Sequence, residues 1–202
     1  MTSRWFLAVA VGLSGLVNLA WARPNIVFIF TDDQAPRAVR AAGDKRFITP
    51  NIDRVFHEGA HLVNSFVTTP VCSPSRVGLI ASRYGSEMQI TDWINPRSEP
   101  ALGLAPGTPT WPTLLSDAGY ATALVGKWHL GTADRYHPTR FGYGYFMGIR
   151  TGGCPPKNPT LELPDRQVRR VNGYTCDIFT DHVLEFIREH REKFRIALLK
   201  LA

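Results

Sequence analysis

One stretch of the chain carries residue types that could act on an anionic substrate. Cys72 is followed by Ser73, Pro74, Ser75 and Arg76, and Pro74 with the apolar run after it predicts a helix that starts here. The free N–H groups of a helix N-terminus and the guanidinium of Arg76 would both favour a negative ligand. Cys72 is therefore a candidate nucleophile. For a cysteine without further context, a small buried side chain in a turn is the more frequent role.

Two adjacent carboxylates are the second candidate group. Asp32 and Asp33 follow 25–30, a continuous apolar run that predicts a central strand buried on both faces of an α/β sheet. Neighbouring carboxylates repel each other unless something compensates their charge. A helix cap and a hard cation with oxygen ligands both remain open, and ligands of open α/β sheets bind at this edge.

Lys127 and His129 follow a second predicted buried strand, 120–125, and glycines flank them. Two residues apart in an extended segment, they would point to the same side. On their own, a lysine and a histidine with this spacing are most often a surface pair.

Together these stretches resemble the type I sulfatases. Cys72–Arg76 with Leu79–Ala81 resembles the first signature of that family, in which the cysteine is converted to formylglycine. Only its closing glycine differs, because Ser82 stands there. The stretch Gly119–His129 resembles the second signature. Two signatures in the right order, about fifty residues apart, are hard to attribute to chance.

The resemblance implies a sulfuric ester hydrolase that cleaves sulfate esters, including those of glycans. It implies that a formylglycine-generating enzyme modifies Cys72. The hydrated aldehyde would attack sulfur, and one of its oxygens would bind a divalent cation, as in the family a calcium ion. The substrate would be a sulfated small molecule or glycan.

The resemblance also implies a role for each of the other candidates. Asp32 and Asp33 would ligate the cation, which polarises the sulfate. Arg76 and Lys127 would hold the hydrate and neutralise developing charge. His129 would contact the second hydroxyl and assist its deprotonation.

Two other functions remain open. One is an inactive truncated fragment or a protein that binds sulfated ligands through the same pocket. The other is a related formylglycine-dependent phosphonate or phosphate ester hydrolase. The net charge of +6 fits acidic substrates, but no run of Lys and Arg forms a stripe, so no nucleic-acid partner is expected.

The first 22 residues have the pattern of a signal peptide. Arg4 precedes an apolar run over 5–19, and Ala20-Trp21-Ala22 supplies a small-x-small cleavage pattern. We expect an exported protein, secreted or periplasmic, without a stable membrane span. An uncleaved N-terminal anchor is the alternative.

The remaining elements predict an α/β fold with a mostly parallel central sheet flanked by helices, similar to alkaline phosphatase and the sulfatases. Helices are expected over 50–58, with Ile52, Val55 and Phe56 facing the core, over 110–119, and from Thr175, with an apolar stripe over 179–187. The alternating residues of 62–67 suggest a strand before Cys72. The segment 132–171 looks irregular. In the loop 83–109, Trp93 is expected to be an ordinary buried tryptophan rather than a sugar contact.

Residues 23–202 are expected to be the N-terminal portion of a catalytic domain, truncated after about Lys193. In the family, a proline and a central strand follow this point, and later residues complete the metal site; 194–202 lacks the proline and ends at once. Two aspartates and one hydrate oxygen are too few for calcium, which takes about six to eight oxygens. We therefore expect weak cation affinity and negligible turnover from the isolated chain. Cys154 and Cys176 remain as an even pair that could form a disulfide.

Overall fold

The computed structural model describes residues 23–193 and 195–200, and within them six strands form one sheet in the order β1-β6-β2-β3-β4-β5. The strands are β1 (Ile26–Phe30), β2 (Ala121–Lys127), β3 (Tyr145–Ile149), β4 (Thr160–Glu162), β5 (Val168–Arg170) and β6 (Arg195–Lys200). The first four strands in the sheet order pair in parallel, whereas β4 and β5 are antiparallel. The predicted α/β fold with a mostly parallel sheet is confirmed.

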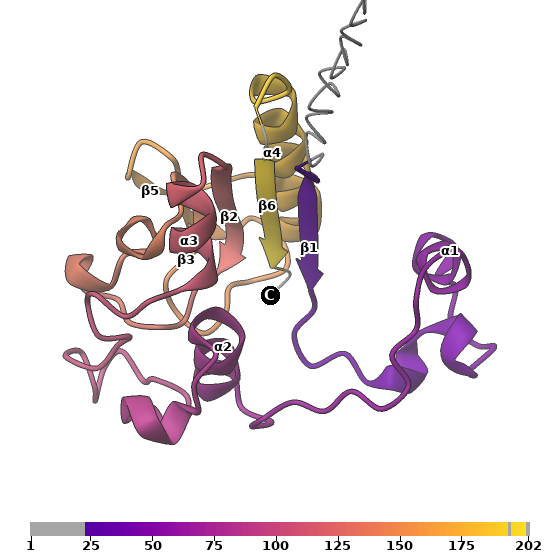
Figure 1. Cartoon of the computed structure of the whole chain (residues 1–202), viewed down its shortest axis with the longest axis horizontal. Helices are drawn as coiled ribbons and strands as arrows, with labels where there is room; N and C mark the ends of the chain where they lie inside the picture. The colour runs from indigo at the N-terminus through magenta and orange to yellow at the C-terminus, as the bar shows by residue number, and fades with distance from the viewer. Residues whose placement is uncertain (1–22, 194, 201–202) are drawn as a thin grey trace, which may run out of the picture.

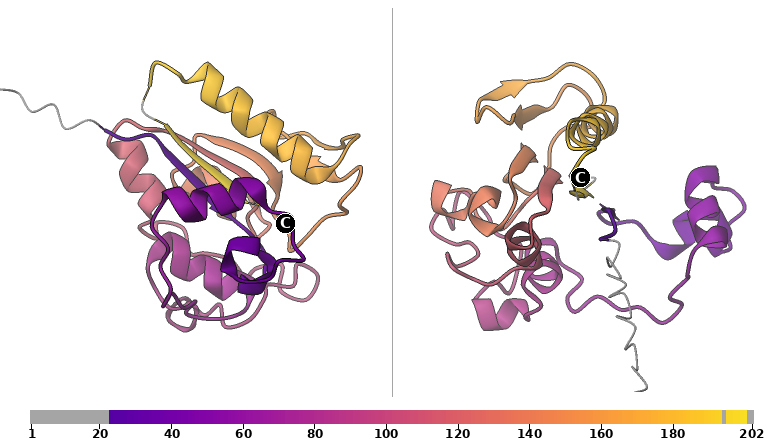
Figure 2. Two further views of the ribbon diagram at one scale, coloured as in Figure 1. Left: turned by 90° about the vertical axis from the view of Figure 1, so that its right-hand side faces the viewer. Right: turned by 45° about the horizontal axis from the view of Figure 1, so that its top comes forward.

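Helices cover both faces of this sheet (Figure 1, Figure 2). The longer helices are α1 (Pro50–Glu58), α2 (Cys72–Ala81), α3 (Trp111–Asp117) and α4 (Thr175–Glu189). Short 3-10 turns occur at η1 (Pro36–Ala38), η2 (Arg40–Ala42), η3 (Gly85–Met88), η4 (Asp134–Tyr136) and η5 (Pro138–Phe141). None of the helices in the described residues is long and apolar enough to cross a bilayer. The predicted signal segment, 1–22, lies outside the described residues.

Two apolar clusters form the core, one on each face of the sheet. Phe179, Val183 and Phe186 of α4 pack with β2 and β3 residues on one face, which confirms the predicted stripe. On the other face, α2 and α3 pack against Leu124 and Trp128. The predicted start of α3 is confirmed as well, because the Oγ1 of Thr110 accepts a hydrogen bond from the N–H of Thr113 (3.3 Å).

The first strand is an edge strand of the described sheet, and the prediction that both of its faces are buried was wrong. β1 pairs with β6 on one side and ends the strand order. Phe28 and Phe30 pack toward the α2 cluster, but Val27 and Ile29 are 53% and 61% exposed. The apolar run correctly predicted a strand, but periodicity alone could not show that α4 leaves this part of the face uncovered.

Residues 31–70 form an extended arm that leaves the sheet at the end of β1 and returns at the start of α2 (Figure 1). The predicted helix over 50–58 is confirmed as α1. The prediction that one face of this helix packs against the core was wrong, since none of its residues is buried and Val55 is 72% exposed. The predicted strand over 62–67 was also wrong: this segment is irregular, with exposed Phe66. None of the strands in the described residues pairs with its backbone.

The segment after Lys193 contains the central strand that the sequence was expected to lack. β6 lies between β1 and β2, with Ile196 paired to both Ile26 and Thr122. The apolar run 196–199 is long enough for a strand without the expected proline. The sequence also failed to predict β3, β4 and β5. Polar loops separate these strands from one another, and β4 and β5 have only three residues each.

A buried ion network holds the far end of the sheet together. His137 is buried, its Nδ1 accepts a hydrogen bond from the N–H of Thr139 (3.3 Å), and its Nε2 lies 3.1 Å from the Oε1 of Glu162. The other carboxylate oxygen of Glu162 pairs with the Nε of Arg150 (2.8 Å), and Arg166 approaches from the next turn (3.5 Å). Because Nδ1 accepts, Nε2 carries the proton and donates to Glu162.

This network predicts that the protein loses stability in mild acid. Burial lowers the pKa of His137, and the charges of Arg166 and Arg150 lower it further. The charge of Glu162 raises it, but by less than the others lower it. Asp134, which pairs with both arginines, is a further charged neighbour. Below pH of about 6.5 the unfolded chain binds the proton first, so the free energy of unfolding should fall as the pH falls.

The measurement is urea unfolding between pH 5.5 and 7.5. His137→Asn is expected to reduce the pH slope by up to about 1.4 kcal/mol per pH unit, the limit for one proton. An unchanged slope in His137→Asn would contradict the prediction.

Candidate active site

Three chain segments bring their polar ends together at one edge of the sheet. Because β1 and β2 run parallel, with β6 between them, their carboxyl ends lie on the same side. The amino end of α2 faces the same region. These segments supply Asp32 and Asp33 after β1, Cys72 and Arg76 on α2, and Lys127 and His129 at the end of β2.

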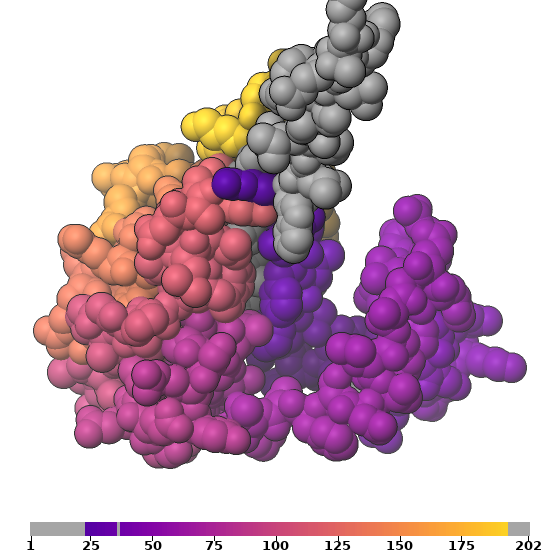
Figure 3. All heavy atoms as spheres, viewed as in Figure 1, coloured from indigo at the N-terminus to yellow at the C-terminus, as the bar shows by residue number. Residues whose placement is uncertain are grey.

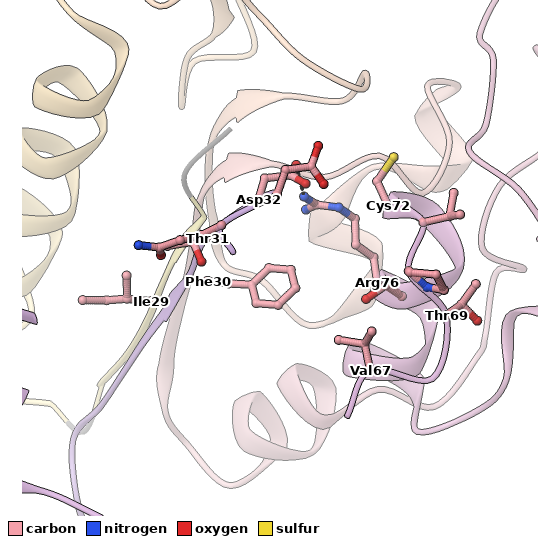
Figure 4. A pocket seen from close by; sticks show the side chains of 13 residues that line it. Ile29, Phe30, Thr31, Asp32, Val67, Thr69, Cys72 and Arg76 are labelled. Carbon is pink, nitrogen blue, oxygen red and sulfur yellow. Dashed lines mark hydrogen bonds and ion pairs between the residues drawn. The ribbon is translucent and has the colours of Figure 1, made fainter. Parts of the chain in front are cut away.

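An ion-pair cluster forms the centre of this region. The Oδ2 of Asp32 accepts hydrogen bonds from the Nη2 of Arg76 (2.9 Å) and the Nζ of Lys127 (2.5 Å). The Nη1 of Arg76 also donates to the backbone carbonyl of Lys127 (2.7 Å), which ties α2 to β2. Figure 4 shows the guanidinium of Arg76 between Asp32 and Cys72. Two cations surround one carboxylate, so the cluster carries a net positive charge.

The charges of this cluster stabilise one another. Burial alone would raise the pKa of Asp32, but the hydrogen bond from Lys127 and the charges of Arg76 and Lys127 lower it overall. Burial lowers the pKa of Arg76 to about 10, against the favourable charges of Asp32 and Cys72. Asp32 and Arg76 are therefore ionised at neutral pH, and Arg76 keeps its charge although it is only 1% exposed.

Cys72 is the first residue of α2, as predicted, and it is half-buried. Its side chain lines a cavity of about 390 Å³ together with Asp32, Asp33 and Arg76 (Figure 4). The next residue, Ser73, is buried, and its Oγ accepts a hydrogen bond from the N–H of Ile94 (3.0 Å). This bond fixes the start of α2 against the loop 83–109.

His129 reaches the site through a different backbone than expected. The sequence predicted an extended segment, but β2 ends at Lys127 and His129 has a left-handed backbone with φ of 56°. Its Nε2 lies 2.9 Å from the carbonyl oxygen of Ile94, which can only accept, so Nε2 carries the proton. Its Nδ1 is buried and has no hydrogen-bond partner among the described residues. Burial lowers the pKa of His129, opposed in part by the bond to Ile94, so the ring is neutral with Nδ1 as an acceptor.

The two aspartates match a hard divalent cation in kind. Asp33 is exposed at the rim of the cavity, and its backbone has φ of 52°, a conformation that aspartate tolerates better than most residues. Carboxylate oxygens are the donors that calcium and magnesium take. In number they fall short, because the described residues contain no group of three or more His, Cys, Asp or Glu side chains placed to hold a metal.

Sequence reasoning missed three features around His129. The carbonyl of Ile94 fixes its tautomer. Gly152 lies directly against its ring, since a Cβ there would sit 2.8 Å from Cε1. Trp93, expected to be buried, is 48% exposed, and its ring centroid lies 6.4 Å from that of His129. The Gly152-Gly153 pair was a usable signal of close approach, whereas the role of a backbone carbonyl leaves no trace in a sequence.

Comparisons with known proteins agree on one family. The family model described as Sulfatase matches residues 24–200. Human steryl-sulfatase is 35% identical over 140 residues, covering 64% of this chain and 24% of its own. The N-acetylglucosamine-6-O-sulfatase of Bacteroides thetaiotaomicron is 30% identical over 171 residues, covering 85% of this chain and 28% of its own.

The fold is similar to solved structures as well. The crystal structure of Ps i-CgsB superposes with a TM-score of 0.83 at 24% identity, covering 88% of this chain and 44% of that one. The chain spans about a quarter of the length of these curated relatives and less than half of that solved chain.

Proposed function

The chain belongs to the sulfatase family, and on that premise we propose that residues 23–202 are the nucleophile-bearing, N-terminal portion of the catalytic domain of a sulfuric ester hydrolase. One observation carries the proposal: Cys72 opens a helix beside the cluster of Asp32, Arg76 and Lys127, and it shares a cavity with Asp32 and Arg76 of that cluster. A helix N-terminus and a net positive cluster together favour an anionic ester. The positive side chains of Arg76 and Lys127 favour an ester whose negative charge lies on the group that reacts.

The substrate class we propose is a sulfate ester on a glycan or another small molecule. The Bacteroides relative is an N-acetylglucosamine-6-O-sulfatase by name, which supports a sulfated sugar. Exposed Trp93, whose ring lies near that of His129, offers an aromatic face on which a sugar ring could stack.

We propose that the chain's own residues position and neutralise the ester. Formylglycine, made from Cys72, would supply as its hydrate one hydroxyl to attack and one to release the product. A calcium or similar cation, held by Asp32, Asp33 and the modified Cys72, would polarise the sulfate. Arg76 is held rigidly by two hydrogen bonds, so it presents a fixed positive charge to the reacting group.

His129 is suited to proton transfer in this scheme. Its Nε2–H is committed to Ile94, so Nδ1 is the nitrogen able to take a proton from a hydroxyl. The lowered pKa keeps Nδ1 unprotonated at neutral pH. Lys127 would share charge neutralisation with Arg76, anchored by its bond to Asp32.

We further propose that residues 1–22 direct export to the periplasm or the exterior, and that a formylglycine-generating enzyme acts on Cys72. These two proposals are linked, because Cys154 and Cys176 would then be the remaining thiols in an oxidising compartment.

The test is the chemical state of Cys72 after coexpression with a formylglycine-generating enzyme. The peptide that contains Cys72 is expected to lose sulfur, gain a carbonyl oxygen and react with a hydrazide, while Cys154 stays a thiol or disulfide. The Cys72→Ala variant should give no hydrazide product. A Cys72 that remains fully alkylatable would contradict the proposal. Comparing the hydrolysis of an aryl sulfate with that of an aryl phosphate then measures whether the protein is specific for sulfate esters.

A further inference from the structure

A second cavity lies beside the ion network of His137 and Glu162, on the side of the sheet that is formed by β3, β4 and β5. Its volume is about 400 Å³, which is within the usual range for small-molecule sites. Its wall includes Thr132, Arg150, Thr151, Thr160, Glu162 and Val168. None of these residues is among the candidate catalytic or metal-binding residues, so the proposed chemistry does not account for this cavity.

The second cavity begins next to the candidate active site. A Cβ on Gly152 would sit 2.8 Å from the Cε1 of His129, and Thr151, the residue before Gly152, lines the cavity. At its other end the cavity reaches Val168 on β5, the strand that ends the sheet order opposite β1. Figure 3 shows this light-orange part of the chain at the surface, on the side away from the arm. A ligand could therefore extend from His129 toward the β5 edge of the sheet.

Three threonine hydroxyl groups in the wall have no hydrogen-bond partner among the described residues, those of Thr132, Thr151 and Thr160. In contrast, the hydroxyl of Thr122 donates to the carbonyl oxygen of Gly142 (2.6 Å). Each hydroxyl group can donate one hydrogen bond and accept two. The wall thus offers both donors and acceptors that the fold itself does not use.

The charged side chains of the wall are paired with each other. The Nε of Arg150 lies 2.8 Å from the Oε2 of Glu162, and its Nη1 donates to Asp134 (2.9 Å). The Nη2 of Arg150 has no partner within the part of the chain that the structure describes. Because one positive and one negative side chain line the cavity, no net charge favours a second sulfate group there. The remaining N–H groups of Arg150 can still bind an uncharged oxygen.

The apolar part of the wall is small. Among the described residues that line the cavity, Ile149 and Val168 are the large apolar ones, and no aromatic ring is present. An aryl or steryl group binds mainly through apolar surface and would find little to pack against. A sugar ring, in contrast, carries hydroxyl groups around most of its edge.

From these observations we infer that the second cavity is a subsite for an uncharged sugar ring. The hydroxyl groups of a sugar both donate and accept, which matches the threonine hydroxyls and the guanidinium of the wall. The further consequence rests on the proposed function: if the sulfate ester reacts beside His129, this ring is the unit that adjoins the sulfated sugar in a glycan. The substrate is then an oligosaccharide or a longer glycan rather than a simple aryl sulfate.

The test is sugar binding to the full chain with ¹³C-labelled threonine methyl groups, followed by NMR. The probes are three uncharged disaccharides, namely lactose, cellobiose and N,N′-diacetylchitobiose. At least one of them is expected to shift the methyl signals of Thr132, Thr151 and Thr160. The signal of Thr180, on α4 and away from the cavity, should stay in place. Inorganic sulfate, titrated separately, should leave the signal of Thr160 unchanged.

Two variants locate the bound sugar. Thr160→Val removes one unused hydroxyl and is expected to weaken binding about fivefold, the loss typical of one neutral hydrogen bond. Val168→Trp fills the cavity and should weaken binding at least about tenfold. Both positions are exposed and tryptophan suits a strand, so both variants should fold, as circular dichroism would verify. Leu184→Trp is the matched control, since Leu184 is an exposed apolar residue on α4 outside the cavity.

Each outcome decides the inference. If none of the three disaccharides shifts the threonine signals, or if inorganic sulfate shifts that of Thr160 instead, the subsite is overturned. Binding that Val168→Trp leaves intact would also overturn it, because the sugar would then lie elsewhere. The probes carry no sulfate, and their binding does not depend on the chemical state of Cys72. Sugar binding without an aldehyde at Cys72 would therefore contradict the proposed function alone, and an aldehyde without sugar binding would overturn the subsite alone.

Discussion

The Asp32→Asn variant is expected to lose about 3 kcal/mol of folding free energy, whereas Asp33→Asn should lose almost none. Asp32 is the shared partner of Arg76 and Lys127, and both of these cations are buried. An amide can still accept a hydrogen bond, but it cannot offset two charges. Asp33 is exposed, and asparagine tolerates its left-handed backbone.

The measurement is urea unfolding in the presence of EDTA, so that stability is compared without bound cations. Calcium affinity, by calorimetry, provides the second measurement: it is expected to be weak in the parent chain and weaker still in both variants, because both would remove a proposed ligand. Comparing the two variants therefore separates the structural role of Asp32 from the metal-binding role that Asp32 and Asp33 would share. Equal stability of the two variants would show that the cluster of Asp32, Arg76 and Lys127 does not hold the site together.

Gly148→Ala is expected to cost more than about 4 kcal/mol, beyond the range of ordinary substitutions. Gly148 on β3 pairs with Gly126 on β2, and a Cβ at position 148 would overlap the carbonyl oxygen of Gly126. The clash is with backbone, so no side-chain rotation relieves it. The φ of Gly148, 150°, is also one that L-residues rarely adopt. The neighbouring Lys127 would lose its position opposite Asp32.

Gly144→Ala is the matched control for this prediction. A Cβ at Gly144, just before β3, would meet the carbonyl oxygen of Thr122 at 3.6 Å, an ordinary contact. Soluble yield and thermal unfolding of the two variants should differ sharply, with Gly144→Ala close to the parent protein. A Gly148→Ala variant that unfolds at the parent temperature would mean that β2 and β3 can separate without cost.

The candidate site could be predicted from sequence because its residues directly follow recognisable elements. Asp32 comes after an apolar run, and Cys72 begins a helix that Pro74 in its first turn predicts, so the sheet edge where both lie follows from general rules. The left-handed backbone of His129 could not be predicted, since it depends on the carbonyl of Ile94 that lies beside it only in the folded chain.

The errors in the fold have a common physical cause. An apolar residue predicts burial only if another element covers it, and coverage is a property of the whole assembly. Val27 and Val55 have the right residue type and spacing for a core, yet neither α4 nor any other described helix covers them. The short strands β4 and β5 were missed for the converse reason, because sheet pairing rather than local sequence holds them extended.

The position of β6 also has a consequence for the order of events during synthesis. β1 and β2 are not neighbours, so neither can complete its pairing until 195–200 has left the ribosome. At about 5–20 residues per second, the first strand waits on the order of ten seconds for its partner. During that interval its apolar side chains, Phe28 among them, are available to chaperones and to other nascent chains. Among the described strands, the slow step of folding should therefore be the insertion of β6 between β1 and β2, and its rate should limit the soluble yield.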